Sequence, residues 1–415
     1  METIAAVLFG VALLHTFGTS VFERLAHRHP QHAGFFHLMG EVEVVFGFWA
    51  FVLIATMALI AGGESAIAYA ESRQFTEPLF VFVVMVVAAS RPVLEAVGSA
   101  MQWLARMLPL GQSVTLVWLG LALVPLLGSL ITEPAAMTLA ALMLAPRLFT
   151  RDMPERLKYA ALGVLFVNVS IGGTLTSYAA PPVLMVADTW NWTSSFMAST
   201  FGWKAALAVL VNATGMVFFL RQHVATDVAT EPSAVAPVAV PWVVIAVHLA
   251  FLAGVVTLAH HPVLFLGLFL FFLGYTQAYA RFQNPLILKE GLLVGFFLAG
   301  LVVLGGMQQW WLQPIVSSLA PTALFFGAIG LTAITDNAAL TYLGSLIEGI
   351  SDPAKYMLMA GAVTGGGLTV IANAPNPAGV ALLRHGFNDH SIGAGNLLLG
   401  ALLPTAVAAA AFLLL

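Results

Sequence analysis

Two apolar stretches of this sequence are interrupted by residues that a straight helix does not tolerate. Residues 366–377 (GGLTVIANAPNP) lie inside an apolar run at 355–383, and residues 172–182 (GGTLTSYAAPP) lie inside a similar run at 158–186. Glycine and proline break the helical hydrogen-bond ladder in each. In lipid, a broken backbone is tolerated only where protein or a water-filled site surrounds it. The two breaks therefore predict a binding site inside a membrane.

Composition places nearly the whole chain in the bilayer. Of its 415 residues, 60% are hydrophobic and 8% are charged, whereas soluble domains carry about 25% charged residues. The absence of cysteine excludes disulfides, thiolate metal sites and cysteine nucleophiles. The net charge of −4, without a basic stripe, leads us to expect no nucleic-acid partner. The N-terminus lacks the basic region of a signal peptide and is expected to be a retained first span.

Apolar runs of about 20 residues, the length of a span, divide the chain into two halves. The first half, 1–220, is predicted to hold three spans, a re-entrant hairpin at 113–149, a broken helix at 159–187 and a final span. A polar loop is expected at 23–37. Residues 221–240, rich in Ala, Pro and Thr, are predicted to form the linker between the halves.

The second half, 241–415, repeats this order, with a hairpin at 321–350 and a broken helix at 356–383. The segment LITEPAAMTLAALML (130–144) aligns with AITDNAALTYLGSLI (333–347), so that polar positions coincide. Thr132 then corresponds to Thr335, and Glu133 to Asp336. The second break carries Asn373 and Asn376 where the first has Ala179 and Pro182. We therefore expect the second half to hold an ion more tightly.

The number of membrane crossings in the first half sets the orientation of the second half. Five crossings per half is an odd number, so the second half is predicted to be inserted upside down. The most basic loop, 147–158, is assigned to the cytoplasm, which also makes the linker cytoplasmic and leaves both termini outside. The predicted fold is an all-α polytopic membrane protein of the cell (inner) membrane. It has two inverted-topology repeats, each with about five spanning helices, one re-entrant hairpin and one broken helix.

The motifs resemble those of the ion transporter superfamily, which includes D-type sodium/proton antiporters, arsenite permeases and citrate or dicarboxylate carriers. They are more similar to the Putative Na+/H+ antiporter family, through TDNAA (335–339), GGTLTSYAAPPVLM (172–185) and GGLTVIANAPNPAG (366–379). In such relatives, the hairpin tips and the broken helices enclose the substrate and coupling ions. The resemblance implies that the following residues bind the ion: Thr132, Glu133, Thr335, Asp336, Asn337, Thr174, Thr176, Ser177, Thr369, Asn373 and Asn376.

The hairpin tips depart from one branch of this superfamily. Dicarboxylate carriers have Ser-Asn-Thr motifs there, whereas this chain has Thr-Glu-Pro and Thr-Asp-Asn. A carboxylate would repel a dianionic substrate by several kcal/mol in a medium of low dielectric constant. A cation or a proton is therefore the favoured substrate. Both carboxylates also stand where a helix begins, so a capping role for Glu133 and for Asp336 is a simpler alternative.

An ionisable residue inside a membrane is a functional candidate by default. A buried carboxylate is neutralised either by a proton or by a bound cation, and the two compete. The sequence thus predicts a secondary transporter that exchanges Na+ (or Li+) for H+, with Asp336 and Asn373 as candidate Na+ ligands and no cofactor beyond the transported ions. The alternatives are an anion, metalloid or carboxylate permease. An intramembrane enzyme is disfavoured, since H-E-x-x-H and G-x-S-x-G motifs are absent.

Other polar segments receive simpler interpretations. Glu41 and Glu43 are expected near the cytoplasmic interface, with a place on a proton path as the alternative. The histidines of 27–37 are interpreted as a solvated loop rather than a metal site. Segments 91–108 and 308–319 are predicted to lie along the membrane surface, where they could frame a homodimer. The expected partners are the lipid bilayer, small inorganic ions and a second copy of the chain.

Overall fold

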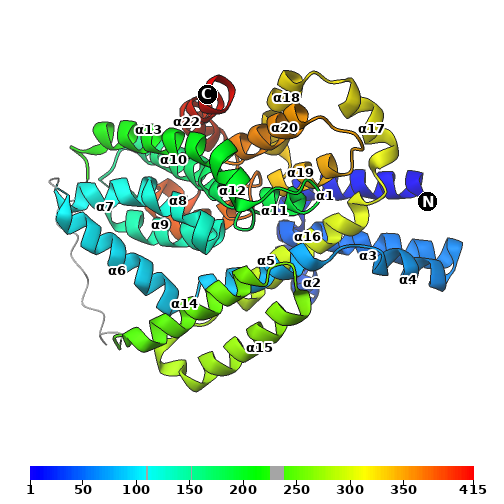
Figure 1. Ribbon diagram of the computed structural model, residues 1–415, viewed down its shortest axis with the longest axis horizontal. Helices are drawn as coiled ribbons and strands as arrows, with labels where there is room; N and C mark the ends of the chain where they lie inside the picture. Colours follow the sequence, from blue (N-terminus) through cyan, green and yellow to red (C-terminus); the bar gives the residue numbers. More distant parts are fainter. Residues whose placement is uncertain (109–110, 151, 225–237) are drawn as a thin grey trace.

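The computed structural model describes residues 1–108, 111–150, 152–224 and 238–415, and every regular element in these ranges is a helix (Figure 1). Six of the helices are long and apolar enough to span a membrane, and eight if two bent pairs are each counted as one span. The chain is therefore a multi-pass membrane protein. The predicted linker, 221–240, lies mostly outside the described residues.

The first six helices precede the first predicted hairpin. They are α1 (Glu2–Arg28), α2 (Ala33–Gly40), α3 (Val42–Ala61), α4 (Gly63–Glu71), α5 (Thr76–Ala88) and α6 (Arg91–Met107). The polar loop predicted at 23–37 is wrong in one respect, because α1 continues to Arg28 and α2 begins at Ala33. Residues 23–28 (ERLAHR) include neither glycine nor proline, and Pro30 ends the run. The predicted surface segment at 91–108 is the helix α6, which bends away from α5 by 62°.

The first predicted hairpin is made of three helices. These are α7 (Gln112–Leu121), α8 (Leu123–Ile131) and α9 (Glu133–Leu148). A bend of 45° separates α7 from α8, so the first arm is not straight. The tip is the single residue Thr132, and Pro134 occupies the first turn of α9, where its missing N–H is not needed.

The first broken helix follows. It consists of α10 (Glu155–Gly172), a 3-10 turn at Gly173–Leu175, an extended stretch and α11 (Pro181–Ala187). After the short helix α12 (Ser194–Met197), the half ends with α13 (Trp203–Leu220). Two consecutive prolines start α11 and require the preceding Ala180 to be extended (φ −96°, ψ 125°). This local chemistry is why the helix stops and restarts.

The second half contains nine α-helices among the described residues. They are α14 (Trp242–Thr257), α15 (Pro262–Ala278), α16 (Leu288–Gly305), α17 (Gln309–Ser318), α18 (Pro321–Ile334), α19 (Asn337–Ser345), α20 (Asp352–Gly365), α21 (Asn376–Leu383) and α22 (Ala394–Leu414). The second hairpin is α18 and α19, and the second broken helix is α20 and α21. Residues 366–375 between α20 and α21 contain no helix.

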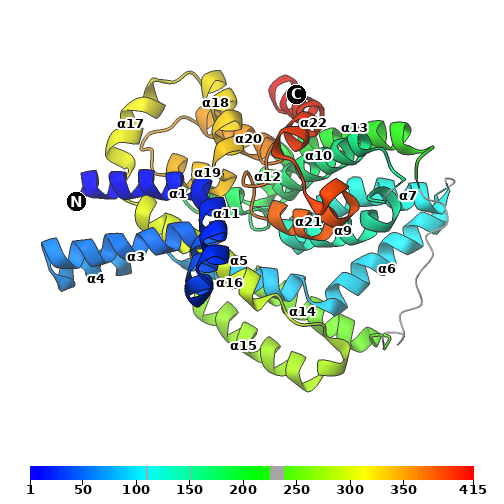
Figure 2. The same ribbon diagram turned by 180° about the vertical axis from the view of Figure 1, so that it is seen from behind.

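The two halves pack against each other reciprocally. Helix α11, which ends the first broken helix, packs on α19 of the second hairpin, and α21, which ends the second broken helix, packs on α9 of the first hairpin (Figures 1 and 2). The helices α10 and α20 also meet where they break. A Cβ atom at Gly366 or Gly367 would collide with Ser170 or Val167, respectively, so only glycine permits this approach. The breaks and tips thus share one buried centre.

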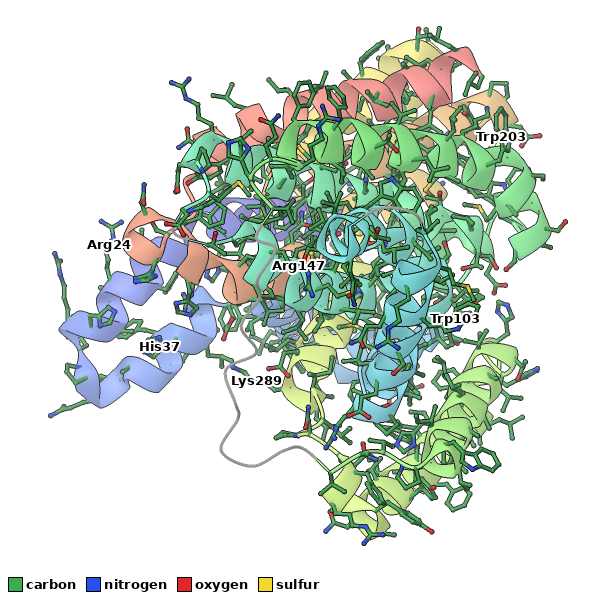
Figure 3. The ribbon with its side chains drawn as sticks, turned by 90° about the vertical axis from the view of Figure 1, so that its left-hand side faces the viewer. Arg24, His37, Trp103, Arg147, Trp203 and Lys289 are labelled. Atoms are coloured by element: carbon green, nitrogen blue, oxygen red, sulfur yellow. The ribbon has the colours of Figure 1, made fainter. Side chains whose placement is uncertain are left out.

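Polar contacts join distant segments of the chain. Lys289 Nζ lies 3.4 Å from Glu41 Oε1, and Lys158 Nζ donates to the Gly386 carbonyl at 2.6 Å. At another site, His260 lies 3.5 Å from Asp188. Figure 3 shows Arg24 and His37 at the side opposite Trp203.

Candidate functional site

Glu133 is the first residue of α9 and is completely buried (0% exposed). Its Oε2 accepts a hydrogen bond of 2.8 Å from Nδ2 of Asn373 in the second break. Its Oε1 has no hydrogen-bond partner and lies against the backbone at Gly173 in the first break, where any Cβ would collide with it. One carboxylate therefore touches both broken helices.

No basic side chain among the described residues lies within ion-pair distance of Glu133 or of Asp336. A buried carboxylate without a basic partner is costly, because it loses its hydration and gains no opposite charge. Something other than an arginine or lysine must therefore neutralise Glu133.

Thr132, at the tip of the first hairpin, is buried and has a positive φ of 75°. This conformation costs a β-branched residue about 1–3 kcal/mol. Its hydroxyl oxygen has no hydrogen-bond partner. The tip thus places a strained residue and an unpaired oxygen directly before Glu133.

Asp336 immediately precedes α19 and caps it. Its Oδ1 accepts hydrogen bonds from the backbone N–H groups of Ala338 at 2.8 Å and Ala339 at 3.1 Å. The capping role considered from the sequence is therefore real, and it leaves Oδ2 for another partner. The neighbouring Thr335 donates its hydroxyl to the Leu331 carbonyl at 2.7 Å.

Asn337 follows Asp336 and is completely buried. Its backbone N–H donates to the Ala372 carbonyl at 3.1 Å, which ties the second tip to the second break. Neither atom of its side-chain amide has a hydrogen-bond partner. Asn337 therefore contributes one unpaired acceptor and one unpaired donor to the buried centre.

The second break is held by two amides and a hydroxyl. Asn376 donates Nδ2 to the carbonyls of Gly366 and Thr369, both at 2.8 Å, and Thr369 donates its hydroxyl to the Ala333 carbonyl at 2.8 Å. The amide oxygens of Asn373 and Asn376 remain without partners. Each amide thus uses its donor for structure and leaves its acceptor open.

The first break is held mainly through Ser129 of α8. Ser129 donates to the Gly172 carbonyl at 2.7 Å, and its own carbonyl accepts from the Thr176 hydroxyl at 2.6 Å. Thr174 donates to Ile171 at 2.7 Å, and Ser177 lies 3.1 Å from Ser194. These hydroxyls hydrogen-bond to structural groups rather than to Glu133 or Asp336.

A cavity of about 250 Å³ extends between the start of α3, near Glu41, and the second tip and second break. It is lined by α1, the start of α3, α16, the second tip and the second break, and both Asp336 and Asn373 border it. A second cavity, of about 560 Å³, is bordered by Arg73, Glu77, Asp188 and His260. Ala339 of α19 lines the first cavity, and Tyr342 and Ser345 of the same helix line the second, so α19 borders both cavities.

Sequence reasoning missed several polar residues of this centre. Ser129 hydrogen-bonds to the first break, and Ser170 of α10 donates to the Val363 carbonyl of α20. Thr332 and Thr364 are buried with unpartnered hydroxyl oxygens. The alignment of the two hairpins pairs Ser129 with Thr332 when it is extended by one residue toward the N-terminus. This pairing of two hydroxyl residues could have identified both as candidates. Among the described residues there is no group of three or more His, Cys, Asp or Glu side chains placed to hold a metal ion.

Comparisons with known proteins bear on the whole chain. No curated protein shows significant sequence similarity to it. Among solved structures it is similar to the YdaH transporter of Alcanivorax borkumensis, described as having an unusual topology, with 15% identity and a TM-score of 0.47 over 89% of this chain and 96% of that chain. Residues 1–415 match the family described as Putative Na+/H+ antiporter. The chain therefore belongs to this family and is a membrane transporter.

Proposed function

We propose that this transporter exchanges Na+ (or Li+) for H+, and that the two ions compete for the carboxylates of Glu133 and Asp336. The observation that carries the proposal is the state of Glu133, which is fully buried, has no basic partner among the described residues and keeps Oε1 open. A proton or a small cation is the neutralising partner that such a group needs.

The surrounding atoms are suited to a hard cation. Na+ prefers oxygen ligands, by analogy with Ca²⁺ and Mg²⁺. Open oxygens in this centre belong to Glu133, Thr132, Asn373, Asn376 and Asn337. A proton on a carboxylate removes the charge that attracts the cation, so binding of one ion expels the other. The exchange needs no cofactor beyond the two ions.

The N-termini of the helices that begin at the site argue against an anionic substrate. Four helices, α9, α11, α19 and α21, begin at the centre, and such N-termini attract anions. However, Asp336 already occupies the N–H groups of α19, and α9 starts with Glu133. Helices α11 and α21 carry proline in the first turn, where an N–H donor is missing. The N-termini of α9 and α19 therefore already have a carboxylate, and those of α11 and α21 lack an N–H donor. The positive ends of these helices partly balance the negative charge of the buried carboxylates.

We propose that the two halves form inverted repeats and that access alternates between the two cavities. The reciprocal packing of α11 on α19 and of α21 on α9 supports this arrangement. The cavity beside Glu41 would face the cytoplasm of the cell (inner) membrane, with both termini outside, since Glu41 and Glu43 are expected near the cytoplasmic interface. Rocking of the elements around a fixed central site is the usual motion of such transporters.

The proposal is tested with purified protein in liposomes that carry a pH gradient and an internal pH-sensitive dye. Addition of Na+ or Li+ should collapse the gradient, whereas K+ and arsenite should not. The half-saturating Na+ concentration should rise about tenfold for each pH unit on the acidic side, because one proton displaces one cation. Collapse by arsenite or another small oxyanion alone would contradict the proposal and favour an anion permease.

A further inference from the structure

The cavity that borders Asp336 also borders two further acidic residues. Its lining includes the junction between α2 and α3, where Glu41 and Glu43 lie. The same lining includes Asp336 and Asn373. With about 250 Å³, the cavity has room for several water molecules. The cavity therefore joins the α2–α3 junction to the proposed ion site.

The two glutamates of this junction differ in their surroundings. Glu41 lies 3.4 Å from Lys289 Nζ, so its charge is already compensated in part. Glu43 lies in the first turn of α3, borders the cavity and forms no ion pair among the described residues. A carboxylate that faces a narrow, low-dielectric passage concentrates cations in it.

Two further groups of the cavity are suited to a cation. Asn373 is 1% exposed, and its amide oxygen has no partner although its Nδ2 donates to Glu133. Thr16 and Thr19 of α1 donate their hydroxyl protons to the carbonyls of Ala12 and Thr16, so that oxygen lone pairs stay available on the cavity wall. The buried, unpartnered amide oxygen of Asn373 and the hydroxyl oxygens of the two threonines make a cavity that favours cations over anions.

We propose that Glu43 is an entry site, which binds the monovalent cation or the proton on the wall of this cavity before it passes to Asp336 and Asn373. The inference rests on the proposed Na+/H+ exchange and adds a second binding carboxylate to it. Glu43 acts on ion capture, whereas Asp336 takes part in the exchange itself.

The test compares Glu43→Gln with Glu43→Asp and with Glu290→Gln in liposomes. Glu290 is a suitable control because it is an exposed acid in the first turn of α16 and does not border the cavity. Glu43→Gln should raise the half-saturating Na+ concentration about tenfold, with the rate at saturating Na+ unchanged within about twofold. Glu43→Asp should restore most of the affinity, and Glu290→Gln should behave like the wild type.

The outcomes separate the two proposals. If Glu43→Gln binds Na+ like the wild type while Asp336→Asn is inactive, the entry site is refuted and the exchange mechanism stands. If Asp336→Asn exchanges ions normally, both the entry site and the exchange mechanism are refuted. If Glu43→Gln does not fold, Thr19→Cys decides instead, since the natural chain has no cysteine. Na+ should slow its reaction with a membrane-impermeant thiol reagent, and absence of protection would overturn the entry site.

Discussion

Asn373 donates a 2.8 Å hydrogen bond to Glu133 although the two residues are 240 positions apart in the sequence. This contact joins the first hairpin to the second broken helix. It directs the amide donor at the carboxylate and leaves the amide oxygen of Asn373 and Oε1 of Glu133 open. The proposed ion site is thus shared between the halves rather than contained in one of them.

Removing the charge of Glu133 should abolish tight ion binding without unfolding the protein. Gln has nearly the same shape, and its amide oxygen can still accept the hydrogen bond from Asn373. We expect Glu133→Gln to weaken Na+ binding by about 10–100-fold, the value of one charge-assisted contact, with Tm unchanged or raised. Isothermal titration with Na+ and a thermal melt provide the measurements. A large drop in Tm together with normal Na+ affinity would assign Glu133 a structural role.

The two breaks should contribute unequally. Asn373→Ala removes an amide from the second break and should weaken Na+ binding about tenfold or more, because Glu133 loses its hydrogen-bond donor. Ala179 is the residue at the corresponding position of the first break, and Ala179→Gly should leave Na+ binding nearly unchanged. Titration of both variants checks the difference. Equal losses of ion binding in the two variants would contradict the predicted asymmetry.

The strain at Thr132 should be separable from its role in binding. Thr132→Gly relieves a φ of 75° and should therefore stabilise the fold by about 1 kcal/mol, because the relieved strain outweighs the greater flexibility of glycine in the unfolded chain. The same change removes an unpartnered hydroxyl oxygen and should weaken Na+ binding. A raised Tm with unchanged Na+ affinity would show that the hydroxyl is not a ligand.

The contact between Gly173 and Glu133 gives a steric test. A Cβ at residue 173 would collide with Oε1 of Glu133 and lie 2.8 Å from its Cγ. Gly173→Ala should therefore displace the carboxylate and lower the exchange rate by at least about tenfold. Gly215 of α13 has nothing within 4 Å of its ideal Cβ, so Gly215→Ala is the matched control and should retain full exchange. Loss of exchange in the control as well would show that the effect of Gly173→Ala does not depend on the contact with Glu133.

The sequence predicts where the helices of this fold are interrupted. It predicts less well which residues contact these interruptions. Proline and glycine act locally, so the breaks and tips fall where they were expected, at 173–180, 366–375, Thr132 and 335–336. The second half was expected to combine Asp336 with the asparagines. In the structure, Asn373 bonds to Glu133 of the first half, whereas Asp336 bonds to its own helix.

That reciprocal pairing could not be derived from periodicity or composition. It depends on how α21 packs on α9, and two apolar helix faces in a bilayer carry little sequence information about their partner. The bend at Ala122 and the helical character of 23–40 were missed for a similar reason, because neither is marked by a strong local signal. Ser129 was not predicted as a site residue, although the residues that follow it align with the second hairpin.

The central claim is that a membrane-embedded carboxylate carries the exchanged ion, and Asp336→Asn in sealed membrane vesicles tests it most directly. Asn is a good helix cap, so α19 should still form, and Asp352→Asn, at an exposed acid paired with Lys355, is the control. We predict that Asp336→Asn loses Na+-dependent proton movement while the control keeps it. Cation-dependent proton movement of wild-type size in Asp336→Asn would contradict the mechanism.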